Sequence, residues 1–311
     1  MEIGILLMEK ISSMLLACLV GFIIVRIKLI KVEDSTVLST ILAFVCSPCA
    51  IVSAFQIEYS KEKIEGLLIA LVIVIVLHIF YIQFTKGLGG ILKLQSLERA
   101  SIIYSNAGYI TIPIVYAVLG PEWVFYTCAY IVVQTILLWT HCRGLICEKN
   151  VVEWKKVIWN PNFIAIYIGI FMFLSGLEFP TILENGMQDF SGLLGPISML
   201  IVGMLMGVEN IPEMFKTRKI YGICCLRLLL IPLCTLVILV GVSMFITHPD
   251  LHNMMLIILW AASGPIGSTV TQLTQIYGLD DQYAGRLTLV SVLLCLFTMP
   301  AITMLFEMYC K

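Results

Sequence analysis

Long apolar runs with almost no charge recur along the whole chain, and they constrain the fold more than any other feature. Mean hydropathy is +1.00, and only 13 % of the 311 residues are charged. A soluble domain carries roughly a quarter charged residues, so a soluble fold would leave this chain with too little polar surface. Apolar runs of about 18–25 residues are the length of membrane-spanning helices. We therefore predict an all-α polytopic membrane protein.

Ten transmembrane helices account for these runs. Their expected ranges are 5–26, 36–56, 64–84, 99–119, 123–146, 162–179, 190–208, 219–246, 251–276 and 283–306. The connections between them are short, and none is long enough for a soluble domain. Because the N-terminus lacks a basic segment and a small-residue cleavage site, we expect the first run to be a retained span rather than a signal peptide.

The distribution of lysine and arginine predicts the orientation. Fourteen of them lie in the connections after spans 1, 3, 5, 7 and 9, whereas four lie on the other side. By the positive-inside rule the first set is cytoplasmic. We therefore expect a multi-pass protein of the plasma membrane with both termini extracytoplasmic and the connection between spans 5 and 6 in the cytoplasm. The net charge of −1 gives no reason to expect nucleic-acid binding.

Five spans in each half would place two repeats in opposite orientations. Short similarities between the halves set Gly21 against Gly169 and Gly108 against Gly264. We expect a first five-helix repeat at 1–147, a cytoplasmic linker at 148–161 and a second, inverted repeat at 162–311.

Spans 4 and 9 carry glycine and proline among polar residues, in "YSNAGYITIP" and "SGPIGSTVTQ". Such residues free backbone groups that lipid cannot satisfy, so the breaks must be buried in protein or line a cavity. Matching interruptions in two inverted halves point to a transporter's binding site at the membrane midplane. The N-terminus of a half-helix carries partial positive charge and suits a carboxylate. Pro48 in span 2 and Pro232 in span 8 stand alone, and we interpret them as structural kinks.

At these residues the chain resembles the auxin efflux carrier family, which includes bacterial organic-acid permeases and the plant PIN-type auxin exporters. The similarity lies in "YSNAGYITIPIVYAVLGPEWVFYTCAYIVVQTILLWTHCRG", "WNPNFIAIYIGIFMFLSGLEFP" and "SGLLGPISMLIVGMLMG". It implies broken spans 4 and 9 that cross, as in sodium/bile-acid symporters and crossed-helix sodium–proton antiporters. It also implies an elevator-type carrier, with a dimerising scaffold of spans 1, 2, 6 and 7 and a moving unit of spans 3–5 and 8–10. The bacterial branch is the closer in form, since the plant exporters' long cytoplasmic loop is absent.

The family's span 4 asparagine matches Asn106, and its two crossing prolines match Pro113 and Pro265. "GSTV" after Pro265 and "CSPC" in span 2 depart from the family's more apolar pattern and leave the substrate's identity open.

From the breaks and the resemblance together we expect a substrate site at the crossing of spans 4 and 9. Its residues are Asn106, Gly108, Thr111, Pro113, Ser263, Gly264, Pro265, Gly267, Ser268 and Gln272, with Ser47, Ser105, Tyr130 and Gln134 as second choices. Asn106 would donate its amide to a carboxylate. The N–H groups near Gly108 and from Gly264 to Gly267 would surround the negative charge, and the two prolines would hold the helices open.

Other polar residues have weaker functional readings. Cys46 and Cys49 form a C-x-x-C inside a span, where redox chemistry lacks its usual context and a thiol behaves as a small hydrophobe. His78 could titrate near neutral pH, although one buried histidine is more often a packing residue. Arg227 lies about two turns from Lys219, so we expect its side chain to reach the cytoplasmic face, with a functional role inside the span as the alternative.

Metal ligation by His248, Asp250 and His252 is conceivable, but no second cluster supports it. We expect no metal, no cofactor and no catalytic residues.

The function that fits best is secondary transport of small organic anions, such as malate-like or auxin-like acids. The expected partners are this substrate, membrane lipid and a second copy of the chain. No carboxylate lies at the centre of a span, which favours a uniporter or anion exchanger over a carrier with its own proton-binding carboxylate. Proton symport and the direction of transport stay open. The alternatives are a non-transporting sensor with the same fold and an intramembrane enzyme, for which the sequence contains neither H-E-x-x-H nor G-x-S-x-G.

Overall fold

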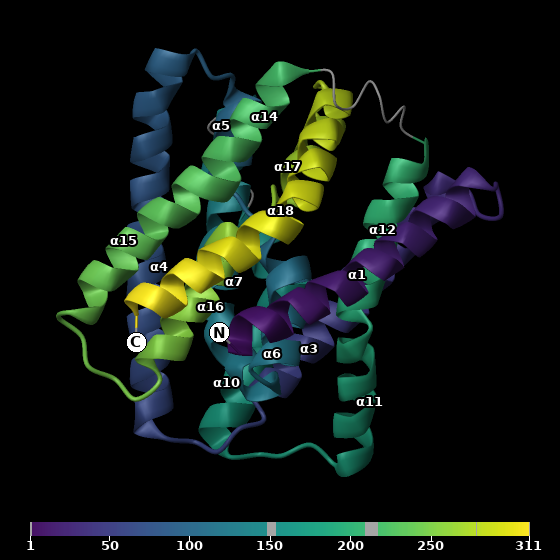
Figure 1. Ribbon diagram of the computed structural model, residues 1–311. Coiled ribbons are helices and arrows are strands. Elements are labelled where there is room, and N and C mark those ends of the chain that lie inside the picture. Colours follow the sequence, from purple (N-terminus) through teal and green to yellow (C-terminus); the bar gives the residue numbers. More distant parts are fainter. Residues whose placement is uncertain (1, 148–153, 209–216, 278, 311) are drawn as a thin grey trace. The chain divides into compact units, whose positions relative to one another are not determined.

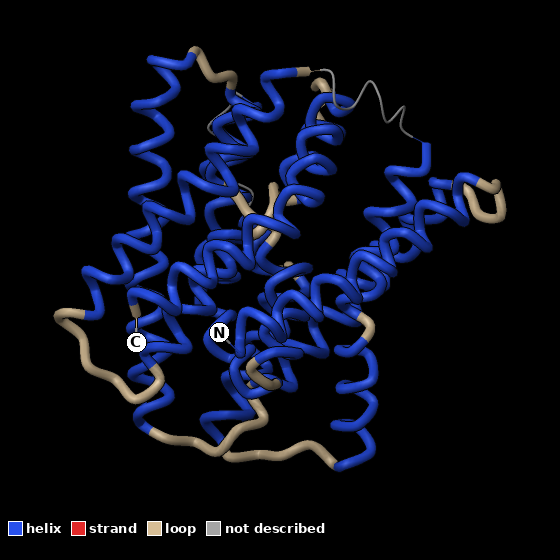
Figure 2. Tube along the Cα trace, in the orientation of Figure 1, coloured by secondary structure: helices blue, strands red, loops and turns tan. Residues whose placement is uncertain are grey.

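The computed structural model describes residues 2–147, 154–208, 217–277 and 279–310. All regular structure within these ranges is helical, joined by short loops (Figure 2). Lys149, Lys216, Lys311 and the part of the linker at 148–153 lie outside the described residues. The prediction of an all-α fold is confirmed.

Within the described ranges, ten apolar helices overlap the ten predicted spans one by one. Seven are long enough to cross a membrane, namely Leu6–Arg26, Val32–Ala54, Lys61–Leu92, Pro121–Ile146, Thr181–Val208, Arg218–Ser243 and Gln282–Tyr309. Three are shorter, namely Ala107–Val118, Pro161–Ser175 and Leu251–Ser263. The first and last of the short helices lie in spans 4 and 9, the two spans predicted to be broken. The chain is thus a polytopic membrane protein.

The described chain divides into two compact units, and each is described by itself. Unit 1 comprises residues 1–63, 108–128 and 158–214, and unit 2 comprises residues 64–107, 129–157 and 215–311. Unit 1 therefore contains predicted spans 1, 2, 6 and 7. It also takes in residues 108–128, which the sequence analysis assigned to the moving part.

Unit 1 is built around helices that approach closely through small residues. Its main helices are α1 (Glu2–Arg26), α2 (Ser35–Ile41), α3 (Ser47–Ala54), α6 (Ile112–Val118), α10 (Pro161–Ser175), α11 (Thr181–Gly192) and α12 (Leu194–Val208). A Cβ added at Gly21 of α1 would collide with the Leu200 carbonyl of α12, and one added at Gly203 of α12 would collide with the Cys18 carbonyl of α1. Close backbone contact of this kind is the usual way in which membrane helices associate.

Unit 2 contains long helices such as α4 and α18 together with the shorter helices on either side of the breaks (Figure 1). Its elements are α4 (Lys61–Leu92), α5 (Ser96–Ile103), most of α7 (Val124–Leu137), η5 (Leu138–Cys142), α8 (Arg143–Cys147), α9 (Trp154–Ile158), α14 (Arg218–Cys225), η6 (Leu226–Leu230), α15 (Ile231–Ser243), α16 (Leu251–Ser263), α17 (Ser268–Ile276) and α18 (Asp281–Tyr309). Buried side-chain hydrogen bonds join these helices: Tyr81 of α4 to Thr235 of α15 at 2.6 Å, and Trp260 of α16 to Thr303 of α18 at 2.8 Å.

Both isolated prolines, Pro48 and Pro232, follow a widened, π-type turn. The turn η2 (Leu42–Cys46) precedes Pro48, and η6 precedes Pro232, so that each proline lies at the start of the next α-helical segment. The backbone before each proline stays helical, with Cys46 and Leu230 in the α region, and local π-type adjustments are one way in which membrane helices tolerate a proline. Both prolines are therefore accommodated locally, which agrees with their interpretation as structural residues.

Candidate functional site

Two helices of unit 2 break and their extended ends join. Helix α5 ends at Ile103 and helix α16 ends at Ser263. The chain then runs extended, and Ser105 and Ile266 form an antiparallel bridge. Its two backbone hydrogen bonds run from the Asn106 N–H to the Pro265 carbonyl at 2.8 Å and from the Gly267 N–H to the Tyr104 carbonyl at 3.0 Å. We call residues 104–106 and 264–267 the crossover.

Local sequence explains the second break. A proline disfavours helical backbone in the residue before it, and Gly264, before Pro265, has φ −59° and ψ 155°. Gly267 is needed for the close approach, because a Cβ there would lie 2.9 Å from the Ser105 carbonyl oxygen. The first break has no such local cause, since Tyr104 is extended (φ −99°, ψ 121°) without a following proline.

Side chains from neighbouring helices hold both extended segments. The Gln134 side chain of α7 accepts hydrogen bonds from the Ser105 N–H at 3.1 Å and hydroxyl at 2.9 Å, and it donates to the Ser105 carbonyl at 2.9 Å. On the other segment, the Ser291 hydroxyl of α18 accepts from the Ile266 N–H at 3.0 Å. Gln134, a second-choice binding residue, therefore positions Ser105.

Arg227 lies directly against the crossover. It is fully buried, and its guanidinium donates to the carbonyls of Gly264 at 3.1 Å, Ile102 at 3.1 Å, Ile103 at 3.3 Å and Ala262 at 2.9 Å. The expectation that its side chain reaches the cytoplasmic face is wrong. The broken helices leave carbonyls inside the protein that need hydrogen-bond donors, and the guanidinium supplies them.

The predicted site residues of unit 2 differ in burial and in their partners. The Ser263 hydroxyl is buried and has no partner among the described residues, whereas the buried Tyr130 side chain interacts with Ser105 and Arg227. The Asn106 side chain is half-buried. Ser268, also half-buried, opens α17, and Gln272 is exposed on the same helix. Unsatisfied buried hydroxyls are uncommon in proteins, and the one on Ser263 lies at the end of α16, next to the crossover.

Three other predicted residues, Gly108, Thr111 and Pro113, belong to unit 1. Thr111 is buried with an unpartnered hydroxyl. Pro113 lies in the first turn of α6 after the π-type turn η3 (Ala107–Thr111). Because the chain departs from helix at 104–106, Pro113 does not hold this break open, in contrast to Pro265. The second-choice Ser47 donates to the Asn162 side chain within unit 1 at 2.9 Å.

The backbone N–H groups are arranged differently from the prediction. Those of Ile266 and Gly267 donate to the Ser291 hydroxyl and the Tyr104 carbonyl, so they are not available to an anion. The N–H groups that stay without a partner inside a helix are those of its first turn. In α17 these begin at Ser268 and Thr269.

Other singled-out residues have structural partners. His78 Nδ1 lies 2.9 Å from the Val74 carbonyl, and its ring packs against those of Tyr81 and Tyr130. Its buried Nε2 has no partner among the described residues. The Asp250 N–H donates to His248 at 3.1 Å.

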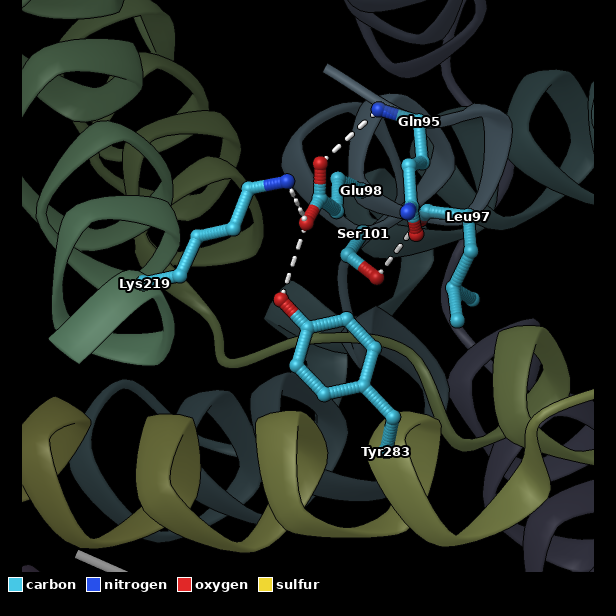
Figure 3. Close-up of polar contacts among 6 residues, drawn as sticks. All are labelled: Gln95, Leu97, Glu98, Ser101, Lys219 and Tyr283. Carbon is cyan, nitrogen blue, oxygen red and sulfur yellow. Dashed lines mark hydrogen bonds and ion pairs between the residues drawn. The ribbon is translucent and has the colours of Figure 1, made fainter. Parts of the chain in front are cut away.

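A second buried polar cluster joins three helix starts in unit 2 (Figure 3). The carboxylate of Glu98 on α5 is buried and lies 2.6 Å from the Lys219 ammonium of α14. It also accepts from the Tyr283 hydroxyl of α18 at 2.9 Å and from the Gln95 N–H at 2.8 Å. We call these residues the Glu98 cluster. It ties the first half of span 4 to spans 8 and 10.

The comparison with known families agrees with this architecture. The model of the family described as "Membrane transport protein" matches residues 6–303. The chain belongs to this family. It is the auxin efflux carrier type of membrane transporter, so the resemblance seen in the sequence is confirmed. No curated protein matched the chain at the significance required. The membership supports a role in membrane transport.

Proposed function

We propose that this protein is a secondary transporter of small organic anions that binds its substrate at the crossover. The observation that carries the proposal is the joining of two broken helices in one unit, with the cation Arg227 held against them. Irregular backbone at membrane depth occurs where it is buried or lines a site, and paired broken helices mark the binding sites of carriers. Membership of a membrane transport family supports the same conclusion.

The chemistry around the crossover suits a carboxylate. The Asn106 amide can donate to one oxygen, and the first N–H groups of α17 carry partial positive charge toward another. The unpartnered hydroxyl of Ser263 can orient the rest of the molecule. A carboxylate group is common to malate-like dicarboxylates, other short carboxylates and auxin-like aromatic acids. The proposed class of substrate is therefore small organic acids.

The test is uptake of a panel of labelled carboxylates into proteoliposomes, with and without a pH gradient. We expect flux of at least one acid, and we expect Asn106→Ala to abolish it while expression and particle size stay unchanged. The response of the flux to the gradient reports whether a proton moves with the substrate.

A matched control is Asn253→Ala, which removes an asparagine of the same unit near the start of α16. It should transport like the wild type. Full activity of Asn106→Ala would contradict the site. Binding of an acid by thermal shift without flux of any acid would show a receptor with a carrier's fold.

We also propose that unit 2 carries the substrate across the membrane while unit 1 serves as a scaffold and dimerises. Unit 1 contains the four spans expected in the scaffold, and unit 2 contains the crossover. Both termini are proposed to be extracytoplasmic, on the basis of lysine and arginine distribution. Cross-links in native membranes between cysteines placed on α10 of two copies would support dimerisation through unit 1. A monomeric particle would contradict the dimer.

A further inference from the structure

Arg227 has an environment that differs from that of an ordinary buried arginine. In the described part of the chain no carboxylate lies within ion-pair distance of it. Its guanidinium donates to four backbone carbonyls, and the Tyr130 side chain also interacts with it. An arginine stays protonated in proteins, so the crossover contains a permanent positive charge that is balanced by dipoles alone.

The four carbonyls are free because the two helices break. In a continuous helix the carbonyl of Ile102 would accept from the Asn106 N–H, four residues later. That N–H instead donates to Pro265 across the crossover. Likewise the carbonyl of Ala262 would accept from the Ile266 N–H, which donates to a serine hydroxyl of α18. Buried carbonyls without partners are costly, and Arg227 satisfies those of both helices at once.

Carbonyl groups at the C-terminal ends of half-helices are also a favourable place for a metal cation. They carry partial negative charge, and in carriers with broken helices such carbonyls coordinate sodium ions. In this protein the guanidinium occupies that position from within the chain. Its planar fork reaches α5 and α16 together, as a bound ion would.

We propose that Arg227 is a built-in cation, which takes the place of a bound sodium ion at the crossover, so that substrate binding requires no inorganic cation there. The inference rests on the proposed function of the crossover as the substrate site. Arg227 acts here as a positioning residue, because it holds the backbone that presents Asn106 and the start of α17. Its charge also favours an anion over a neutral ligand at the same site.

The first test needs no substrate and follows thermal stability of the purified protein in sodium, potassium, choline or methylguanidinium chloride. We expect wild-type stability to be the same in all four salts at equal ionic strength. Arg227→Ala should be less stable than wild type in choline, and sodium or methylguanidinium should restore its stability in a saturable way. The control Arg218→Ala removes an exposed arginine of the same unit and should show no cation dependence.

The second test is flux in proteoliposomes with sodium replaced by choline. Wild-type flux should change by less than about twofold, since no ion pairing or hydrogen bond is lost. Arg227→Gln should reduce the flux at least about tenfold, because a buried charged donor is removed. Arg227→Lys keeps the charge and should retain more flux than Arg227→Gln in choline.

Three outcomes overturn the proposal. The first is that wild-type flux requires sodium. The second is that the thermal stability of Arg227→Ala is the same with every cation. The third is that Arg227→Gln and Arg227→Lys show equal flux in choline. If Arg227→Ala does not survive purification, the comparison of the lysine and glutamine variants still decides. If no acid is transported at all, the proposed function fails, and the thermal measurements still test the built-in cation separately.

Discussion

The Gln134 side chain offers the sharpest test of how the first break is held. It makes three hydrogen bonds, all to Ser105, and both residues are buried. Gln134→Leu keeps a similar volume but leaves the N–H and carbonyl of Ser105 without partners. Each such group costs about 1–3 kcal/mol when buried, so the variant should lose roughly 2–6 kcal/mol of stability. Ser105→Ala removes only the hydroxyl bond, which contributes about 0.5–1.5 kcal/mol.

The assay is unfolding of the purified protein in one detergent, read together with flux in proteoliposomes. We expect the order wild type, Ser105→Ala and then Gln134→Leu in stability. Flux should fall in the same order, because Ser105 belongs to the segment that presents Asn106. Gln83→Leu, which replaces an exposed glutamine of α4, is the matched control and should keep wild-type stability. If Gln134→Leu unfolds at the same point as Ser105→Ala, the backbone bonds do not support the break, and the reasoning is refuted.

Two further predictions concern packing and the Glu98 cluster. Gly203→Ala should destabilise unit 1 and reduce the yield of folded protein, because the added Cβ would collide with α1. The control Gly241→Ala should not, because a Cβ there meets no atom within 4 Å. Equal melting temperatures of the two variants would exclude tight α1–α12 packing. Glu98→Gln should lower the free energy of unfolding by about 1–3 kcal/mol, because all three partners of the carboxylate are donors and the new NH₂ group would have to face one of them. The control is Glu65→Gln at an exposed site of α4. An unchanged unfolding transition of Glu98→Gln would contradict the role of the Glu98 cluster.

The positions of the spans and the fact that spans 4 and 9 break could be predicted from the sequence. Apolar length and the scarcity of charge are local properties, and they are sufficient to define a membrane helix. Gly264 and Pro265 likewise act locally, because a proline disfavours helical backbone in the residue before it. These two consecutive residues therefore predict the break in span 9, and helix α16 ends directly before them.

The break in span 4 was predicted for the right span but with the wrong cause. Pro113 has a helical position in α6, and the chain leaves the helix at Tyr104 because Gln134, 29 residues later, replaces the lost backbone bonds of Ser105. No local signal at Tyr104 indicates this. The pairing could be found only once α7 was placed beside the end of α5.

Amino-acid order alone thus determined that this chain is a polytopic membrane protein and which two of its predicted spans are interrupted. The tertiary structure decided which groups satisfy the interruptions. Arg227 looked like a surface-seeking arginine because Lys219 is close in sequence, but its acceptor at Ile102 lies 125 residues away along the chain. Freed backbone groups pair with whatever donor the fold brings near, and such partners are set by packing between distant helices rather than by local sequence.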